Sequence, residues 1–367
     1  MKKIVFAITN LEIGGAERVL VRLVSKLSKK FEITILTVYG EGELTRELPK
    51  EVRVQSIYPK KMEYYSFIKR AWISLQFKLP WFQRRLYRRW VKDQYNVEIA
   101  FLEGPVTALL SVPSKARKIA WIHTDLISHY SKKKYPQLRR SYANYEKLIF
   151  VSEDSRQKFD VIDFDHSLRS CSRVIHNYND DIAVQRLGEE KLDFAFSKFL
   201  NFVVVARLVE AKGLDRLLRV HRRLIDEGKL HHIYVIGDGP LKDALSSLQQ
   251  TFGVEDTFHF LGSQSNPYPY MKRADYLLLP SYYEGYPVTL MEGMALNQYW
   301  VVTAIASTEV LEDYPNKLIV DNTEEAIYEG MKVLVNEKVP RKRKPYHGTS
   351  NEKILEDIVD LIEGEKK

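Results

Sequence analysis

Short apolar runs alternate with segments whose apolar residues recur at helical spacing, and this alternation extends over both halves of the chain. The expected strands of the first half are residues 4–9, 33–38, 97–102, 119–123 and 148–151. Those of the second half are residues 202–206, 232–236, 258–261 and 276–279. Strands that alternate with helices favour parallel sheets covered on both faces. The sequence therefore predicts an α/β protein with two doubly wound domains.

Two glutamates eight positions apart, Glu284 and Glu292, follow the strand expected at residues 276–279. Pro287 favours the first turn of a helix, which places Glu284 in the loop and Glu292 one to two turns along. A helix N-terminus attracts anions, and carboxylates accept hydrogen bonds from hydroxyls. A nucleotide sugar presents both kinds of group. The spacing alone is equally typical of a capped helix with two solvated glutamates.

Two cations, Arg207 and Lys212, follow the strand expected at residues 202–206. Ligands of open α/β sheets bind beyond the carboxyl ends of the strands. Arg207 can grip phosphate oxygens with its planar fork, and Lys212 can add a point charge. A solvated surface pair is the alternative interpretation.

Glycines follow two other predicted strands. Gly237 and Gly239 would let a nucleotide approach the backbone closely, although Gly-Asp-Gly is also a common tight turn. Gly14 and Gly15 follow the first strand without forming the G-x-G-x-x-G fingerprint, which argues against a nicotinamide enzyme.

Together and in this order, the motifs resemble the family-4 retaining glycosyltransferases of the GT-B fold. That fold consists of two Rossmann-like domains facing across a cleft. The segments that carry the resemblance are Gly14-Gly15-Ala16-Glu17, Arg207 with Lys212-Gly213, Gly237-Asp238-Gly239, Asn266-Pro267-Tyr268-Pro269-Tyr270, and the glutamate pair Glu284 and Glu292.

The resemblance implies a role for each matched residue. Arg207 and Lys212 would hold the donor diphosphate, Glu292 the ribose and Glu284 the transferred sugar. His123, at the end of the strand expected at residues 119–123, would bond the donor sugar near the reacting carbon. A strand-end histidine taken alone is also a common structural residue. The implied catalytic set is His123, Glu284, Arg207 and Lys212, and the implied donor set is Gly14, Gly15, Arg207, Lys212, Gly237, Gly239, Glu284, Gly285, Tyr286, Pro287 and Glu292.

Two segments depart from the family pattern. Residues 297–303 and 306–309 lack the usual glycines, which puts donor-phosphate contacts there in doubt. Residues 175–179 read Ile-His-Asn-Tyr-Asn instead of the more common Pro-Asn-Gly. Both departures are of a kind that alters donor choice without removing activity.

The pattern is interrupted near residues 178–198, which suggests a domain boundary there. We expect an acceptor-binding domain at residues 1–180 and a nucleotide-sugar-binding domain at residues 181–348. In the family, a C-terminal helix commonly returns to the first domain, as we expect for residues 349–367. A chain of 367 residues with 45% hydrophobic content is able to bury two cores.

Cysteine usage and hydropathy indicate the compartment. The single cysteine, Cys171, excludes an internal disulfide and a thiolate metal cluster, which suits a reducing cytoplasm. The apolar run after Met1 is too short for a signal peptide and is better interpreted as the first strand. No run approaches the roughly 20 apolar residues of a membrane-spanning helix.

The net charge of +8 is concentrated between Lys60 and Lys92, where Glu63 is the lone acidic residue. Trp and Phe side chains are interleaved with these cations, which suits an anionic membrane surface. The alternatives are a solvated helical face whose aromatics belong to the core, and nucleic-acid binding, which we discount because no nucleic-acid module accompanies the segment. Further cations that would widen this surface are Lys132, Lys133, Lys134, Arg139 and Arg140.

The sequence thus predicts a retaining, metal-independent hexosyltransferase that takes a hexose or N-acetylhexosamine from a nucleotide sugar, expected to be UDP-linked. The donor is a substrate, and no other cofactor is expected. The expected acceptor is a saccharide used in surface-polysaccharide or capsule synthesis. Because the basic segment suits a membrane surface, we expect this saccharide to be lipid-linked. We expect a cytoplasmic protein on the inner face of the cell membrane. The rival hypotheses are a nucleotide-sugar epimerase of the same fold and a non-catalytic subunit of a glycosyltransferase complex.

Overall fold

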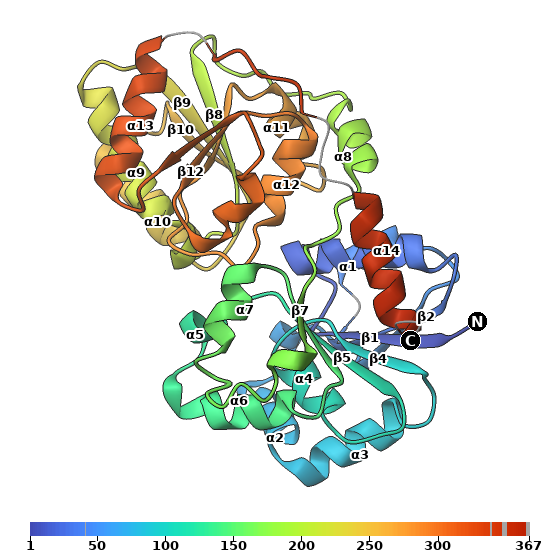
Figure 1. Cartoon of the computed structure of the whole chain (residues 1–367). Helices are drawn as coiled ribbons and strands as arrows, with labels where there is room; N and C mark the ends of the chain where they lie inside the picture. Colours follow the sequence, from blue (N-terminus) through green and yellow to red (C-terminus); the bar gives the residue numbers. More distant parts are fainter. Residues whose placement is uncertain (41, 338–339, 347–350, 365–367) are drawn as a thin grey trace. The chain divides into compact units, whose positions relative to one another are not determined.

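The computed structural model describes residues 1–40, 42–337, 340–346 and 351–364 (Figure 1). The chain divides into two compact units. The first comprises Met1–Asn179 with Ser350–Lys367, and the second comprises Asp180–Thr349. Figure 1 shows helices on either side of the sheet in each unit.

The first unit contains a seven-stranded sheet with the order β3-β2-β1-β4-β5-β6-β7, in which every neighbouring pair is parallel. The order reverses between β1 and β4, which is the usual position of a ligand crevice in doubly wound sheets. The strands are β1 (Lys3–Ile8), β2 (Glu32–Tyr39), β3 (Arg53–Tyr58), β4 (Val97–Ala100), β5 (Arg117–Ile122), β6 (Lys147–Phe150) and β7 (Ser172–Val174).

Eight α-helices are described in the first unit. The C-terminal helix α14 belongs to this unit, where Arg173 and Asp357 form an ion pair of 2.9 Å. The helices are α1 (Gly15–Leu27), α2 (Phe67–Lys78), α3 (Pro80–Trp90), α4 (Pro105–Leu110), α5 (Leu126–His129), α6 (Tyr135–Tyr142), α7 (Glu153–Phe159) and α14 (Asn351–Glu363).

The second unit contains a six-stranded parallel sheet with the order β10-β9-β8-β11-β12-β13. Its strands are β8 (Leu200–Val205), β9 (His231–Ile236), β10 (Phe258–Gly262), β11 (Tyr276–Leu279), β12 (Trp300–Thr303) and β13 (Lys317–Val320). Its helices are α8 (Asp181–Gly188), α9 (Leu214–Asp226), α10 (Lys242–Phe252), α11 (Tyr268–Arg273), α12 (Val288–Ala295) and α13 (Glu324–Glu337).

The doubly wound prediction is confirmed, and each of the nine strands expected from the apolar runs is present, with ends that differ by at most two residues. The sequence did not predict β3, β7, β12 and β13. Three of these lie at sheet edges, where partial exposure breaks the continuous apolar run of a buried parallel strand. The fourth, β12, is buried, but it is only four residues long.

A buried ion pair ties the basic helix α3 to the first sheet. Lys118 Nζ lies 2.5 Å from Glu98 Oε2, on adjacent strands, and both side chains are buried. The hydroxyl of Tyr87, on α3, donates to Glu98 Oε1 at 2.6 Å. The inner face of α3 is therefore fixed through Tyr87, and its arginines occupy the outer face.

Two buried histidines link α9 to β9 in the second unit. His221 Nδ1 lies 2.9 Å from His231 Nε2, and His231 Nδ1 lies 2.8 Å from the carbonyl of Lys229. Thr257 Oγ1 lies 2.8 Å from His221 Nε2. When both rings are neutral, one tautomer of each satisfies all three contacts: each Nδ1–H donates and each Nε2 accepts. Burial lowers the pKa of both, to about 4 for His231.

Folding stability should therefore fall as the pH drops from about 6.5 toward 4. A histidine whose pKa is lower in the folded state favours folding above its unfolded value of about 6.5, and this contribution is lost below it. For His231 alone the loss at pH 5 is roughly 2 kcal/mol. Chemical denaturation at several pH values measures this dependence.

The control is a double variant, His221→Leu with His231→Leu, which removes the titrating pair and keeps side chains of moderate size. Its stability should depend less steeply on pH over the same interval. Equal pH dependence in the two proteins would show that this pair does not govern acid sensitivity.

Candidate donor-binding site

The ends of β8 and β11 approach each other closely because a glycine lies between them. Gly213 has φ of 61°, and a Cβ there would lie 2.2 Å from the carbonyl oxygen of Pro280. The Tyr282 amide donates to the carbonyl of Ala211 at 2.8 Å, joining the loops that follow the two strands. A side chain at residue 213 would push these loops apart.

A buried arginine holds the end of β11 in place. Arg216, in the first turn of α9, donates from Nη2 to the carbonyls of Pro280 at 2.7 Å and Ser281 at 2.9 Å. The same nitrogen donates to Asn322 Oδ1 at 2.7 Å. The guanidinium also lies over the ring of Tyr282, 3.9 Å from its centroid. These contacts fix the backbone from which the loop of Glu284 departs.

Sequence reasoning missed Arg216, although the pattern of α9 contains a signal. Val220 and Leu224 are buried at positions i+4 and i+8 from Arg216, so the arginine lies in the apolar stripe of an amphipathic helix. A charged residue in such a stripe requires buried partners.

The structure brings two of the predicted residues together. Lys212 Nζ lies 2.5 Å from Glu284 Oε1, and the Ser281 hydroxyl donates to the same oxygen at 2.7 Å. Both charged side chains are mostly buried, with exposed fractions of 22% and 11%. The cation predicted for phosphate and the carboxylate predicted for sugar are thus neighbours at the carboxyl ends of β8 and β11.

Arg207 lies exposed in the loop after β8, and it forms no ion pair with the part of the chain that the structure describes. Gly237 and Gly239 lie against the same loop. A Cβ on Gly237 would lie 1.9 Å from the carbonyl of Ala206, and one on Gly239 would lie 2.5 Å from that of Leu208. These glycines therefore serve close packing of the two loops.

Glu292 lies in the second turn of α12, as expected, and only 3% of it is exposed. The Tyr268 hydroxyl donates to its Oε1 at 2.7 Å. Pro287 is the N-cap residue of α12, with φ of −71° and ψ of 110°, so the helix begins one residue later than predicted. The extended ψ of Pro287 accounts for this shift.

The remaining residues of this loop are also held by buried contacts. Tyr286 is buried, and burial first, then the charge of Glu309, raises the pKa of its hydroxyl. The Thr303 hydroxyl donates to the carbonyl of Ser281 at 2.7 Å. Gly285 lies between Glu284 and Tyr286 in the same loop. Residues 306–309, which lack the glycines usual in the family, lie in a 3-10 helix, Ala306–Leu311.

The first unit carries the other predicted residues. Gly14 is the N-cap of α1, and Gly15 is the first residue of that helix. His123 follows β5 and is 9% exposed, and its ring lies 4.6 Å from that of Phe101. Its Nε2 is buried without a hydrogen-bond partner among the described residues. Burial lowers the pKa of His123 to about 3, so the imidazole is neutral.

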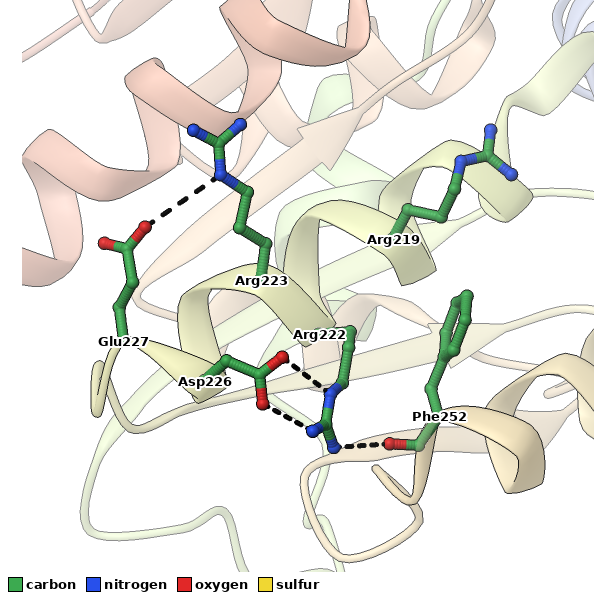
Figure 2. Close-up of a pocket in the computed structure, with 6 residues that line it drawn as sticks. All are labelled: Arg219, Arg222, Arg223, Asp226, Glu227 and Phe252. Carbon is green, nitrogen blue, oxygen red and sulfur yellow. Dashed lines mark hydrogen bonds and ion pairs between the residues drawn. The ribbon is translucent and has the colours of Figure 1, made fainter.

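A hollow of about 460 Å³ in the second unit lies elsewhere (Figure 2). It is lined by Arg219, Arg222, Arg223, Asp226, Glu227 and Phe252. These residues lie along α9 from its middle to the residue that follows it, and at the last residue of α10. Strands β9 and β10 begin shortly after these helices end, so the hollow lies toward the amino edge of the sheet. Figure 2 shows Arg222 facing Asp226 and the Phe252 carbonyl. Its arginines are already paired, and the predicted residues of this unit lie at the opposite edge of its sheet.

Two family models match the chain on either side of the division between the units. The model described as Glycosyltransferase Family 4 matches residues 13–177, and that described as Glycosyl transferases group 1 matches residues 200–337. The chain is a family-4 glycosyltransferase. The matches include each predicted site residue, so that the recognition made from the motifs is confirmed.

Curated relatives of this glycosyltransferase act in the synthesis of surface polysaccharides and lipid-linked saccharides. A Campylobacter jejuni relative is N-acetylgalactosamine-N,N'-diacetylbacillosaminyl-diphospho-undecaprenol 4-alpha-N-acetylgalactosaminyltransferase. It is 26% identical over 356 residues, covering 93% of this chain and 92% of the relative. The lipopolysaccharide core biosynthesis glycosyltransferase LpsD of Rhizobium meliloti is 24% identical over 285 residues, covering 76% and 72% respectively.

Solved GT-B structures share the fold of this glycosyltransferase. S. aureus TarM, solved with UDP among its ligands, has a TM-score of 0.71 at 14% identity, with 99% of this chain and 100% of that chain covered. Anabaena HepE, solved with UDP and glucose, gives the same TM-score, identity and coverage. The predicted GT-B fold is therefore confirmed.

Replacing Arg216 with alanine should destabilise the second unit and weaken UDP binding. The change leaves the carbonyls of Pro280 and Ser281 without their buried donor, at a cost of at least about 2 kcal/mol. Chemical denaturation and calorimetry with UDP measure the two effects.

Arg219→Ala is the matched control, since Arg219 lies one turn further on the same helix and is paired at the surface with Asp215 and Glu324. Its loss should change stability by no more than about 1 kcal/mol. Similar losses in the two variants would contradict a special role for Arg216.

Proposed function

We propose that this glycosyltransferase transfers a hexose or N-acetylhexosamine from a UDP-sugar with retention of the anomeric configuration. The observation that carries the proposal is the group formed by Lys212, Glu284 and Ser281 at the carboxyl ends of β8 and β11, with Arg207 exposed in the loop that follows β8. Its residue types match the donor site of the family that the chain resembles. Solved structures of the same fold, TarM and HepE, carry UDP.

The charges of this group suit departure of a diphosphate. Cleavage of the sugar–phosphate bond leaves negative charge on the diphosphate, which Arg207 and Lys212 would stabilise. Lys212 would then exchange its partner from Glu284 to phosphate. The released Glu284 carboxylate would accept hydrogen bonds from the sugar hydroxyls, and Glu292 would do so for the ribose.

We infer that the reaction needs no divalent metal, because these two cations supply the charge that the leaving group requires. For retention, the acceptor hydroxyl would attack from the face that the diphosphate leaves, and the diphosphate would take its proton. His123 would contribute a neutral imidazole near the donor sugar, and its buried Nε2 would gain a partner there.

We further propose that the acceptor is lipid-linked and that the chain meets it on an anionic membrane. The Campylobacter jejuni relative acts, by its name, on an undecaprenol-linked saccharide. None of the described helices combines the length and apolar character that crossing a bilayer requires. The argument for membrane contact therefore rests on the surface of α2 and α3.

Helix α2 has two apolar faces. Ile73 and Phe77 are buried, whereas Ile68, Trp72 and Leu75 form an exposed stripe, with Ile68 80% exposed. Some aromatic residues of this segment thus belong to the core, as the alternative interpretation held, but others do not. Exposed apolar groups gathered in this way are typical of an interaction surface.

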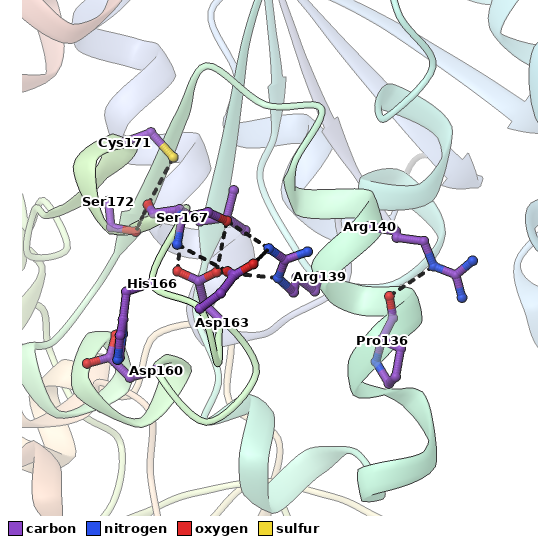
Figure 3. A network of polar contacts seen from close by, with 11 residues as sticks. Pro136, Arg139, Arg140, Asp160, Asp163, His166, Ser167, Cys171 and Ser172 are labelled. Carbon is purple, nitrogen blue, oxygen red and sulfur yellow. Dashed lines mark hydrogen bonds and ion pairs between the residues drawn. The ribbon is translucent and has the colours of Figure 1, made fainter.

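Four exposed arginines, Arg84, Arg85, Arg88 and Arg89, follow on α3, and they form no ion pair within the described residues. Residues of α6 contribute less than the sequence suggested. Arg139 is bound to Asp163, Asp165 and Ser167 (Figure 3), so that its charge is largely offset. The proposed membrane surface is therefore centred on α2 and α3.

Purified protein incubated with a panel of nucleotide sugars in excess chelator should turn over UDP-sugars and form a glycosidic bond of retained configuration, read by NMR.

Lys212→Ala should weaken UDP binding at least about tenfold, because it loses a charge-assisted contact. Glu292→Gln should mainly weaken nucleotide binding, and Glu284→Gln should mainly slow turnover.

Lys272→Ala is the control, since Lys272 is also paired with a glutamate, Glu189, in the same unit. An isomerised donor without a new glycosidic bond would support the epimerase alternative. Absence of turnover with any donor would support a non-catalytic subunit, and a strict metal requirement would contradict the charge argument.

Binding to vesicles that contain phosphatidylglycerol should weaken as the salt concentration rises. Screening already limits the range of attraction between surface charges to about 8 Å at physiological ionic strength, and added salt shortens it further. Changing Arg84, Arg85, Arg88 and Arg89 together to Glu should release the protein from these vesicles and leave UDP affinity unchanged. Co-sedimentation measures binding.

The matched control reverses four cations of the second unit, Lys191, Lys198, Lys229 and Lys242, and so changes the net charge equally. Equal release by both variants would show that overall charge, and not the α2–α3 surface, determines binding. Retention of the arginine variant on vesicles would make a soluble acceptor the better hypothesis.

A further inference from the structure

In the first unit, the carboxylate of Glu103 binds backbone amides just beyond the point where the pairing of β4 with β5 ends. The parallel pairing of β4 with β5 ends at Ala100 and Ala120. Beyond it, Glu103 Oε1 accepts from the backbone N–H of His123 at 2.5 Å and from that of Thr124 at 2.8 Å. Without Glu103, both amide groups would lack a partner from the sheet at a partly buried position.

The loop that carries Glu103 has a fixed shape of its own. Gly104 has φ of 89° and ψ of −125°, a conformation that residues with a side chain rarely adopt. Pro105 begins α4, and the Thr107 hydroxyl donates back to the carbonyl of Leu102 at 2.7 Å. The carboxylate is therefore presented from a defined turn.

The histidine that this carboxylate holds has a ring confined by its neighbours. Phe101 lies 4.6 Å from the His123 ring, and the ring of Trp121 stacks at 6.5 Å. Because the ring is confined and Nε2 is buried without a partner, a small shift of the backbone would move this nitrogen relative to a bound sugar. Burial raises the pKa of Glu103, while the two amide groups oppose that rise.

We propose that Glu103 is a positioning residue, which sets the place of the His123 imidazole by binding the His123 and Thr124 amides. The inference rests on the role of His123 in the proposed function. Glu103 acts through His123 and does not itself touch the donor.

Glu103→Ala should lower kcat for sugar transfer roughly ten- to a hundredfold, as expected when a catalytic group is displaced by a fraction of an ångström to one ångström. Glu103→Gln keeps an oxygen that accepts both amide bonds and should restore kcat to within about threefold of the original. UDP affinity, read by calorimetry, should be unchanged in both variants.

A double-mutant cycle separates positioning from general loosening. In a His123→Ala background, Glu103→Ala should cause no further loss of kcat, because the two residues act as one unit. A full additional loss would overturn the proposal. The control is Asp163→Ala. Asp163 (Figure 3) is another buried carboxylate, and it accepts the backbone N–H of Leu168 at 2.9 Å. This variant should leave kcat unchanged, and a loss equal to that of Glu103→Ala would also overturn the proposal.

NMR of histidine-labelled protein supplies a readout that does not depend on turnover. The His123 imidazole signals, assigned by their absence in His123→Ala, should shift in Glu103→Ala and return in Glu103→Gln. Unmoved signals in Glu103→Ala would overturn the positioning role even if kcat falls. Full activity of His123→Ala with shifted signals in Glu103→Ala would instead remove the catalytic role of His123 and keep the positioning contact.

Discussion

The candidate donor site of the second unit depends on one buried guanidinium. Arg216 enters between the ends of β8 and β11, where Gly213 leaves room, and binds the carbonyls that follow β11. Ser281 is fixed through its carbonyl by Arg216 and by Thr303, and its hydroxyl then binds Glu284. A buried charge is costly unless every donor is used, so the loop can adopt few other shapes. The contact of Glu284 with Lys212 follows from this restriction.

In the first unit, unpaired backbone groups at a strand end are bound by a side chain of the opposite charge. A parallel strand that stops leaves amide or carbonyl groups unpaired at the edge where ligands bind. In the second unit a cation on a helix binds the free carbonyls, and in the first unit the carboxylate of Glu103 binds the free amides of His123 and Thr124. Arg216 and Glu103 each bind backbone groups, so each fixes the place of a neighbouring side chain through the main chain.

Most of the fold can be predicted from the sequence, and so can the charged residues that follow the strand ends, but not the residues that hold the loops in place. Continuous apolar runs reveal central parallel strands, and the cations, carboxylates or glycines directly after them lie at the carboxyl edge of the sheet, as Arg207 and Glu284 do. Edge strands such as β13 are half exposed and give no such run. The roles of Arg216 and Glu103 could not be predicted, because their partners are backbone atoms far away in sequence. No local pattern of residue types records such contacts. The two amide contacts of Glu103 follow only from the pairing of β4 with β5.

The contact of Lys212 with Glu284 bears on how the proposed site would select its ligand. Both side chains are mostly buried, and an unpaired charge at either position would be costly. In this structure each neutralises the other. In the proposed function, a diphosphate that bound Lys212 would leave Glu284 to the hydroxyls of the attached sugar, so both halves of a nucleotide sugar would be needed to replace the original pair. A free phosphate would pair with the lysine and leave the buried glutamate without a partner. The pair would therefore favour the complete donor over its fragments, because an uncompensated buried charge is costly.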